Sequence, residues 1–221
     1  GVAREMQAQE KRDARARYEQ GMAQLEAGNA QIARAAFEEA VALGPRFGPA
    51  WLELGELRLA HGDLYGARDA FSQAASLLRD SARAHYGLGL AFSALRENKA
   101  ALEPLEKIDE TDPLYLAAQI QRGLVQFLLQ RNEAAAASYR RAYKIDPAAA
   151  IADFHAAIQR DPRFGLAGDD GLDDVRRHAR VRGKEGRLLG SPVRPIVLVT
   201  RRPSSTLSDG VAPGLREIGA F

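Results

Sequence analysis

Cysteine is absent from the 221 residues of this sequence, which excludes disulfides, thiolate catalysis and cysteine-based metal sites. Because a chain without cysteine fits reducing and oxidising compartments alike, its location stays open, with the cytoplasm slightly favoured over the periplasm. Long hydrophobic runs are absent too. No stretch approaches the ~18 consecutive apolar residues of a membrane-spanning helix, so we expect no membrane span. The sequence begins with Gly1 instead of Met, which predicts a processed or excised chain.

Residue patterns that support enzyme chemistry are also missing. The four histidines lie far apart and share no metal-ligand spacing with acidic residues. The acidic run at 169–174 lacks the alternate spacing of a calcium loop, and 183–186 lacks the residue order of a phosphate-binding loop. No nucleophile motif surrounds Ser204, Ser205 or Ser208. We therefore predict that the chain is not an enzyme and has no catalytic residues, metal or cofactor.

Charge is unevenly distributed, although the whole chain carries only +2. Residues 176–202 contain nine Lys or Arg residues and one acid, Glu185, which gives this basic segment a net charge of +8, whereas residues 1–175 carry −5. Such a segment could neutralise phosphates, so an anion-binding or nucleic-acid-binding adaptor is one alternative function. The segment has no aromatic residue on which bases could stack, which disfavours nucleic acid and favours a solvated or protein-facing tail.

A 34-residue period is the main organising feature of the sequence. A glycine inside a helix costs about 1 kcal/mol relative to alanine, so a recurring one indicates that two helices approach closely beside it. Proline at the end of a unit stops its second helix, and each unit is therefore predicted to be a helical hairpin. The columns in phase are Gly21, Gly55, Gly89 and Gly123; Ala33, Ala67, Ala101 and Ala135; Phe37, Phe71, Leu105 and Tyr139; and Pro45, Pro113 and Pro147.

These columns resemble the tetratricopeptide repeat, because Trp51, Leu54, Gly55, Ala67, Phe71 and Ala74 follow one another in the order typical of that family. The resemblance implies an all-α fold, a right-handed α-solenoid of four helical hairpins with capping helices and a C-terminal extension. It also implies a protein-interaction scaffold or adaptor. The departures are Arg79 in place of proline, His85 in place of tryptophan, Arg96 and Gln130 in place of the turn glycines, and Pro104 inside a second helix, where we expect a kink.

The period also predicts the domain boundaries. We expect a solvated helical lead-in at 1–13 and four repeats at 14–47, 48–81, 82–115 and 116–149. Phe154, Ala157 and Pro162 then keep the spacing of a second helix, which could cover the end of the solenoid, so the repeat domain is predicted to span 14–162. A short capping helix is expected at 163–182, followed by a basic extension with glycine, proline and serine at 183–221.

The extension has a fainter resemblance to the start of the sulfotransferase domain that some bacterial proteins append to tetratricopeptide repeats. The similar residues are an apolar run at 195–199 followed by Arg202, Pro203, Ser204, Ser205, Thr206 and Leu207. The glycine of the family's phosphate-cradling loop is replaced by serine, and fewer than thirty residues remain after the run. A regulatory N-terminal fragment of a larger, sulfotransferase-like enzyme is therefore the second alternative function.

The resemblance places a partner-binding groove on the first helices of the repeats, at inward positions spaced by four and three residues. Most of these side chains are apolar, which suits an apolar peptide or an amphipathic helix of a protein partner of unknown identity. The other interpretation of this apolar stripe is that it is core, covered by the chain's own tail. The predicted groove residues are Tyr18, Met22 and Leu25; Leu52, Glu56 and Leu59; Tyr86 and Leu90; and Ile120, Leu124 and Phe127, with Ser93 as a further polar position.

The same positions disfavour one well-known use of this family, the capture of chaperone tails by their terminal carboxylate. Members with that activity present lysine, asparagine and arginine side chains. The matching residues here are Tyr18, Met22, Glu53, Arg83 and Gly87, and among them only Arg83 could hold a carboxylate.

Overall fold

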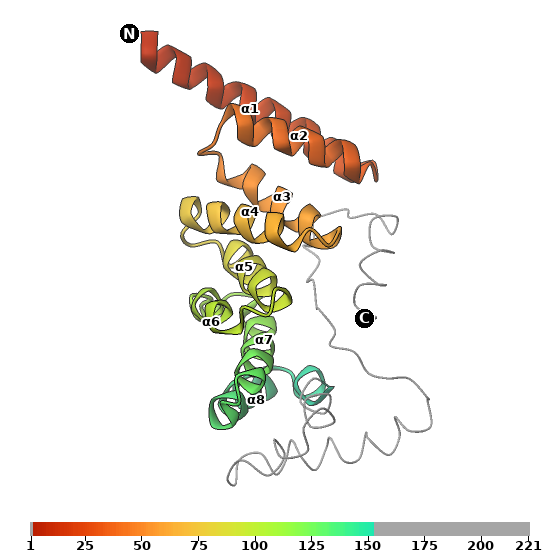
Figure 1. Cartoon of the computed structure of the whole chain (residues 1–221), viewed down its shortest axis with the longest axis vertical. Helices are drawn as coiled ribbons and strands as arrows, with labels where there is room; N and C mark the ends of the chain where they lie inside the picture. The colour runs from red at the N-terminus through yellow and green to blue at the C-terminus, as the bar shows by residue number, and fades with distance from the viewer. Residues whose placement is uncertain (1, 153–221) are drawn as a thin grey trace. The chain divides into compact units, whose positions relative to one another are not determined.

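The computed structural model describes residues 2–152, and in that range the secondary structure is helical without a strand (Figure 1). The predicted all-α fold of helical hairpins is confirmed. A further helix begins at Pro147 and continues to the end of the described range. The helices with complete bounds are α1 (Val2–Glu26), α2 (Ala30–Leu43), α3 (Gly48–Ala60), α4 (Leu64–Leu77), α5 (Ala82–Ala94), α6 (Asn98–Glu106), α7 (Tyr115–Leu128) and α8 (Asn132–Ile145).

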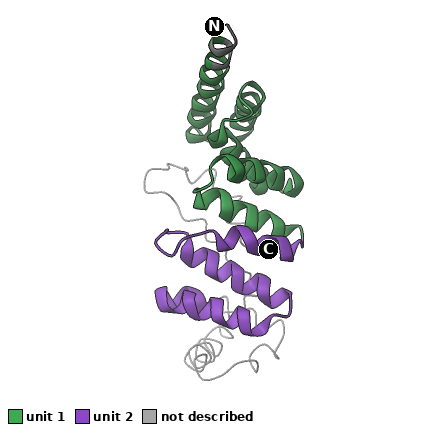
Figure 2. Cartoon of the chain, turned by 90° about the vertical axis from the view of Figure 1, so that its left-hand side faces the viewer, with its two compact units in different colours: residues 1–95, 200–218 green, residues 96–199, 219–221 purple. Residues whose placement is uncertain are grey.

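The helices fall into two compact units, and the boundary lies between Leu95 and Arg96, in the turn after α5 (Figure 2). In unit 1, helix α1 packs on α2 and α3 packs on α4, while α2 contacts α3 and α4 contacts α5. In unit 2, helix α7 packs on both α6 and α8. Within each unit, helices that follow one another in the sequence are therefore in contact, as expected for stacked hairpins.

The glycine column makes room for an aromatic ring. A Cβ atom placed on Gly21 would lie 2.5 Å from a ring carbon of Phe37, and one on Gly55 would lie 2.8 Å from the ring of Phe71. Contacts below 3.0 Å do not occur for real Cβ atoms, so any larger residue would displace the ring. The same relation joins Gly123 and Tyr139, at 2.7 Å. The close approach predicted from the period is therefore that of a first helix to the aromatic side chain of its second helix.

The turns between first and second helices need a left-handed backbone. Gly28 and Gly62 adopt φ values of 81° and 79° at the end of α1 and α3. Arg96 and Gln130 take the equivalent places after α5 and α7, with φ values of 64° and 60°. Residues with a side chain pay about 1 kcal/mol or more in this region, so these two turns carry strain that the glycine turns avoid.

We expect Arg96→Gly and Gln130→Gly each to raise the free energy of unfolding by a few tenths to about 1 kcal/mol, because relief of strain outweighs the added flexibility of glycine. Chemical denaturation followed by circular dichroism measures the change. Arg96→Ala is the matched control, since it removes the same side chain and retains the Cβ atom; it should not stabilise. If Arg96→Ala raised the free energy of unfolding as much as Arg96→Gly, relief of backbone strain would not be the cause.

Pro104, where we expect a kink, lies inside α6 near its end. Helix α6 has 9 residues and ends at Glu106, whereas α4 has 14. A proline cannot donate a backbone hydrogen bond and crowds the preceding turn, so it weakens the last turns of this helix. Ile108 follows outside the helix and is still buried.

The structure describes the beginning of the predicted repeat domain and part of its end. The lead-in at 2–13 and the first helix of the first repeat form one continuous helix, α1. After Pro147, Ala150 and Ile151 are buried and join the apolar cluster around Tyr139 in unit 2, so this helix covers part of that cluster. The parts of the chain predicted after this helix lie outside the described residues. They are Phe154 to Pro162, the predicted capping helix at 163–182, the extension at 183–221 and the basic segment 176–202.

Candidate protein-binding face

We use the term first-helix face for the eleven predicted groove residues, taken separately in unit 1 on α1, α3 and α5 and in unit 2 on α7. Each of these side chains is buried or partly buried. Four are buried, namely Leu52, Tyr86, Ile120 and Phe127. The other seven are partly buried, namely Tyr18, Met22, Leu25, Glu56, Leu59, Leu90 and Leu124, as is Ser93.

In unit 1 the apolar members of this face rest on the aromatic cores of their hairpins. Tyr18, on α1, packs against the ring of Phe37 with centroids 5.7 Å apart, and edge-on against Phe47 at 5.4 Å. Leu59, on α3, packs on the cluster that contains Phe71. A partner on this face would therefore meet apolar side chains that the core holds in place.

In unit 2 the predicted groove residues differ in how deeply they are buried. Ile120 and Phe127 belong to the buried cluster that contains Tyr139, so both contribute to the core of the α7–α8 hairpin. Leu124 lies on the same helix between them and keeps part of its surface accessible. A substitution at Phe127 would disturb the core before it reported on binding, whereas Leu124 is the safer probe.

The polar centre of the face in unit 1 is an ion cluster between α3 and α5. Arg83 Nη1 donates to Glu53 Oε1 at 3.1 Å and Nη2 to Glu53 Oε2 at 3.3 Å, a bidentate pair. Arg83 Nε and Nη2 also donate to Glu56 Oε1, at 3.0 and 2.6 Å. Burial alone would lower the pKa of Arg83, but Glu56 and then Glu53 outweigh it and raise this pKa above its ordinary value. The guanidinium therefore stays charged, and its hydrogen bonds to the two carboxylates are charge-assisted.

Glu53, Glu56 and Arg83 were each named from the sequence, but the cluster in which Arg83 binds both glutamates was not predicted. The sequence signal for this cluster is a pair of glutamates three residues apart on one helix, followed by an arginine at the second position of the next repeat. Because α3 and α5, the first helices of these two repeats, contact each other, the three residues pair across the repeat boundary.

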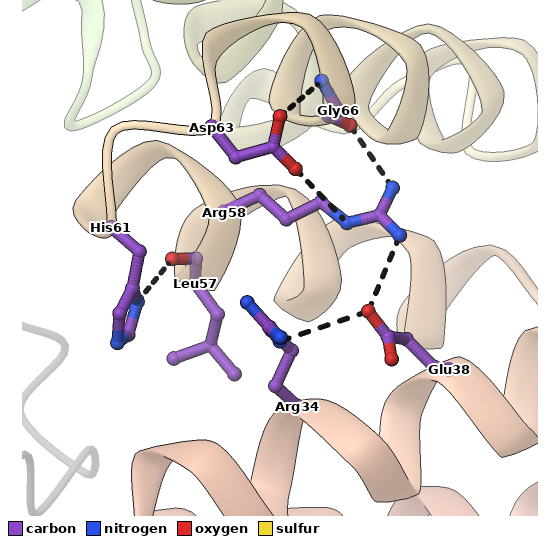
Figure 3. A network of polar contacts seen from close by, with 7 residues as sticks. All are labelled: Arg34, Glu38, Leu57, Arg58, His61, Asp63 and Gly66. Carbon is purple, nitrogen blue, oxygen red and sulfur yellow. Dashed lines mark hydrogen bonds and ion pairs between the residues drawn. The ribbon is translucent and has the colours of Figure 1, made fainter.

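A second polar network ties the first two repeats together away from this cluster (Figure 3). Arg58, on α3, donates from Nη2 to Glu38 Oε1 of α2 at 3.4 Å and from Nη1 to the backbone oxygen of Gly66 in α4 at 3.3 Å. Its Nε also lies 3.8 Å from Asp63 Oδ2, and the other oxygen of Asp63 caps α4 by accepting from the Gly66 N–H. One side chain thus links three helices of unit 1.

His85 replaces Trp51 in the repeat and preserves its hydrogen bond. Trp51 Nε1 donates to the carbonyl oxygen of Pro45, six residues earlier, at 2.9 Å. His85 Nε2 lies 2.7 Å from the carbonyl oxygen of Arg79, again six residues earlier. The tether between a first helix and the preceding inter-repeat turn is therefore kept when the residue type changes.

Within residues 2–152, no group of three or more His, Asp or Glu side chains is placed to hold a metal ion. The helices of this range also include none long and apolar enough to cross a membrane.

Models of the tetratricopeptide repeat match residues 18–77, 52–115 and 116–149, which together make up more than half of the chain. No curated protein sequence matches. Among solved structures, a MamA protein is 20% identical with a TM-score of 0.61 over 76% of this chain and 96% of its own. YrrB is 19% identical with a TM-score of 0.62 over 78% and 92%. The Pseudomonas aeruginosa protein pilF is 15% identical, with a TM-score of 0.56 over 82% and 93%.

These likenesses extend over nearly the whole length of each solved structure and support the helical-hairpin fold. The repeat matches coincide with the period of glycine, alanine and aromatic columns and with the observed helix pairs. The chain therefore belongs to the tetratricopeptide repeat family, whose members serve as protein-interaction scaffolds.

Proposed function

We propose that this chain binds an apolar peptide or an amphipathic helix of a protein partner on its first-helix face, and that it acts as a scaffold without catalysis. The observation that carries the proposal is the accessible apolar surface of Leu59 and Leu90 in unit 1. These residues lie on α3 and α5, two first helices that contact each other. A similar use is printed for one structural neighbour, since YrrB is described as a protein with an unusual peptide-binding site.

The two alternative functions receive less support. Both the sulfotransferase-like fragment and the anion-binding adaptor depend on residues beyond 152, whereas the repeat matches and the fold similarities point to a scaffold. The predicted groove residues on each first helix are also spaced by four and three residues, a spacing that suits the anchor side chains of a helical partner.

Leu90→Asp should weaken peptide binding about thirtyfold or more, because a charge at a central apolar anchor commonly costs about 2 kcal/mol. A displayed library of random 16-residue peptides, selected on the full chain, supplies the ligands, and their affinities are then measured by fluorescence anisotropy. Selected peptides should be rich in leucine, isoleucine and aromatic residues at helical spacing.

The matched control is Tyr65→Asp, which introduces the same charge on the second helix α4, where Tyr65 is 65% exposed. This variant should bind like the wild type, and circular dichroism should show both variants folded. Equal losses in both variants, or unchanged binding in Leu90→Asp, would contradict the first-helix face. A library that yields no binders would contradict the proposed function itself.

A further inference from the structure

We propose that Glu53 and Glu56 mask Arg83, and that this masking makes the first-helix face of unit 1 select against acidic peptides. The proposal rests on the proposed function, because it concerns which peptides the same face accepts. The expected ligand is an amphipathic helix whose contacting residues are apolar or basic, with no carboxylate opposite α5.

The geometry leaves Arg83 little capacity for another anion. All three of its nitrogens donate to carboxylates: Nη1 to Glu53, Nε to Glu56, and Nη2 to both. A carboxylate from a ligand would have to displace one of these acceptors or lie beside two negative charges. Because like charges at such distances repel, either route is unfavourable.

The cluster lies where a bound helix would pass. Leu90 follows Arg83 by seven residues on α5, which is two helical turns along one face, and Leu59 follows Glu56 by three on α3. Arg83 also keeps 25% of its side chain exposed, so its charge is near the surface that a ligand contacts. A peptide that covers both leucines therefore samples the electrostatics of the cluster.

Partial burial of the cluster strengthens its electrostatic effect on a bound ligand. Glu53 is only 7% exposed, so its charge is poorly screened by water and salt. Discrimination between ligands follows from a penalty on the wrong one as much as from attraction to the right one. Here the penalty falls on acidic residues, and the apolar contacts supply the affinity.

The test is to unmask the arginine. The double variant Glu53→Gln/Glu56→Gln keeps side chains of the same shape and removes both negative charges, which leaves the Arg83 charge uncompensated. The random peptide library is selected on the full-length wild type and on this variant in parallel. Aspartate and glutamate should be depleted from wild-type binders and enriched on the variant. Two synthetic peptides that differ only by the exchange of one lysine for glutamate are then measured on each protein. The ratio of their two affinities should differ about tenfold between the wild type and the double variant.

A triple variant that adds Arg83→Gln is the control, because the gain for acidic peptides should disappear when the unmasked charge is removed. If the double variant does not fold, Glu56→Gln alone provides the test, since Glu56 is the more exposed of the two at 40% of its side chain. Binders with the same acidic content on both proteins would overturn the masking proposal, while sensitivity of those binders to Leu90→Asp would leave the proposed function standing. A library that yields no binders on any variant would overturn both.

Discussion

Phe71→Ala should lower the free energy of unfolding of unit 1 by about 3–5 kcal/mol, since truncation of a fully buried phenylalanine removes its packing and leaves a cavity. Phe71 is 1% exposed and lies at the centre of an apolar cluster with Leu52, Ala67, Ala74 and others from α3, α4 and α5. Two glycines, Gly55 on α3 and Gly87 on α5, border its ring. Three helices therefore meet on this one side chain.

Urea denaturation of the full chain, followed by far-ultraviolet circular dichroism, measures this loss. The matched control is Tyr65→Ala on the same helix, which truncates an aromatic side chain that is 65% exposed and should change stability by less than about 0.5 kcal/mol. Because the two units need not unfold together, hydrogen exchange of α3 and α4 should report the same loss locally. A loss below about 1 kcal/mol for Phe71→Ala would contradict the central role of the ring.

The hairpin fold could be predicted from the sequence because its main contacts are local and repeat. Gly21 meets Phe37, Gly55 meets Phe71, and each pair is separated by sixteen residues, so one hairpin brings the two together. Because the repeat is 34 residues long, the same contact recurs in the fourth repeat. The departures also follow the pattern, since Arg96 adopts the backbone conformation of the glycine that it replaces.

The burial of the predicted groove residues could not be predicted from the same period. A stripe along one helix identifies a face, but it does not say how much of that face the neighbouring helices cover. Ile120 and Phe127 are buried with Tyr139, whereas Leu124 retains accessible surface, although all three share the stripe on α7. The division of the repeats into two units at Leu95 has no marker in the sequence that we recognise.

The ion cluster escaped prediction for a different reason. Its partners come from two repeats and are separated by 27 and 30 residues, so neither helix alone reveals the pairing. The period aligns columns of equal residues, whereas these three residues occupy different columns. Contacts between unlike columns of neighbouring repeats therefore need the three-dimensional arrangement of α3 and α5.

Arg83→Met should lower the free energy of unfolding of unit 1 by about 2–3 kcal/mol. Removal of one partner from a buried ion pair leaves the other charge uncompensated, and this typically costs about 3–5 kcal/mol when both groups are fully buried. The expected loss is smaller here because Arg83 keeps 25% and Glu56 keeps 40% of their side-chain surface. Methionine retains most of the aliphatic length, so the change reports mainly on the charge.

Arg15→Met is the matched control, since Arg15 pairs with Glu19 on the surface of α1 with 72% and 62% of the two side chains exposed. Such pairs contribute about 0–1 kcal/mol, so this variant should unfold in urea almost like the wild type. Addition of Glu53→Gln to Arg83→Met should recover part of the lost stability, because the buried charge that had lost its partner is then neutral. Equal losses in the two methionine variants would mean that the cluster contributes no more than a surface pair. Its position between two first helices would then serve ligand selection alone.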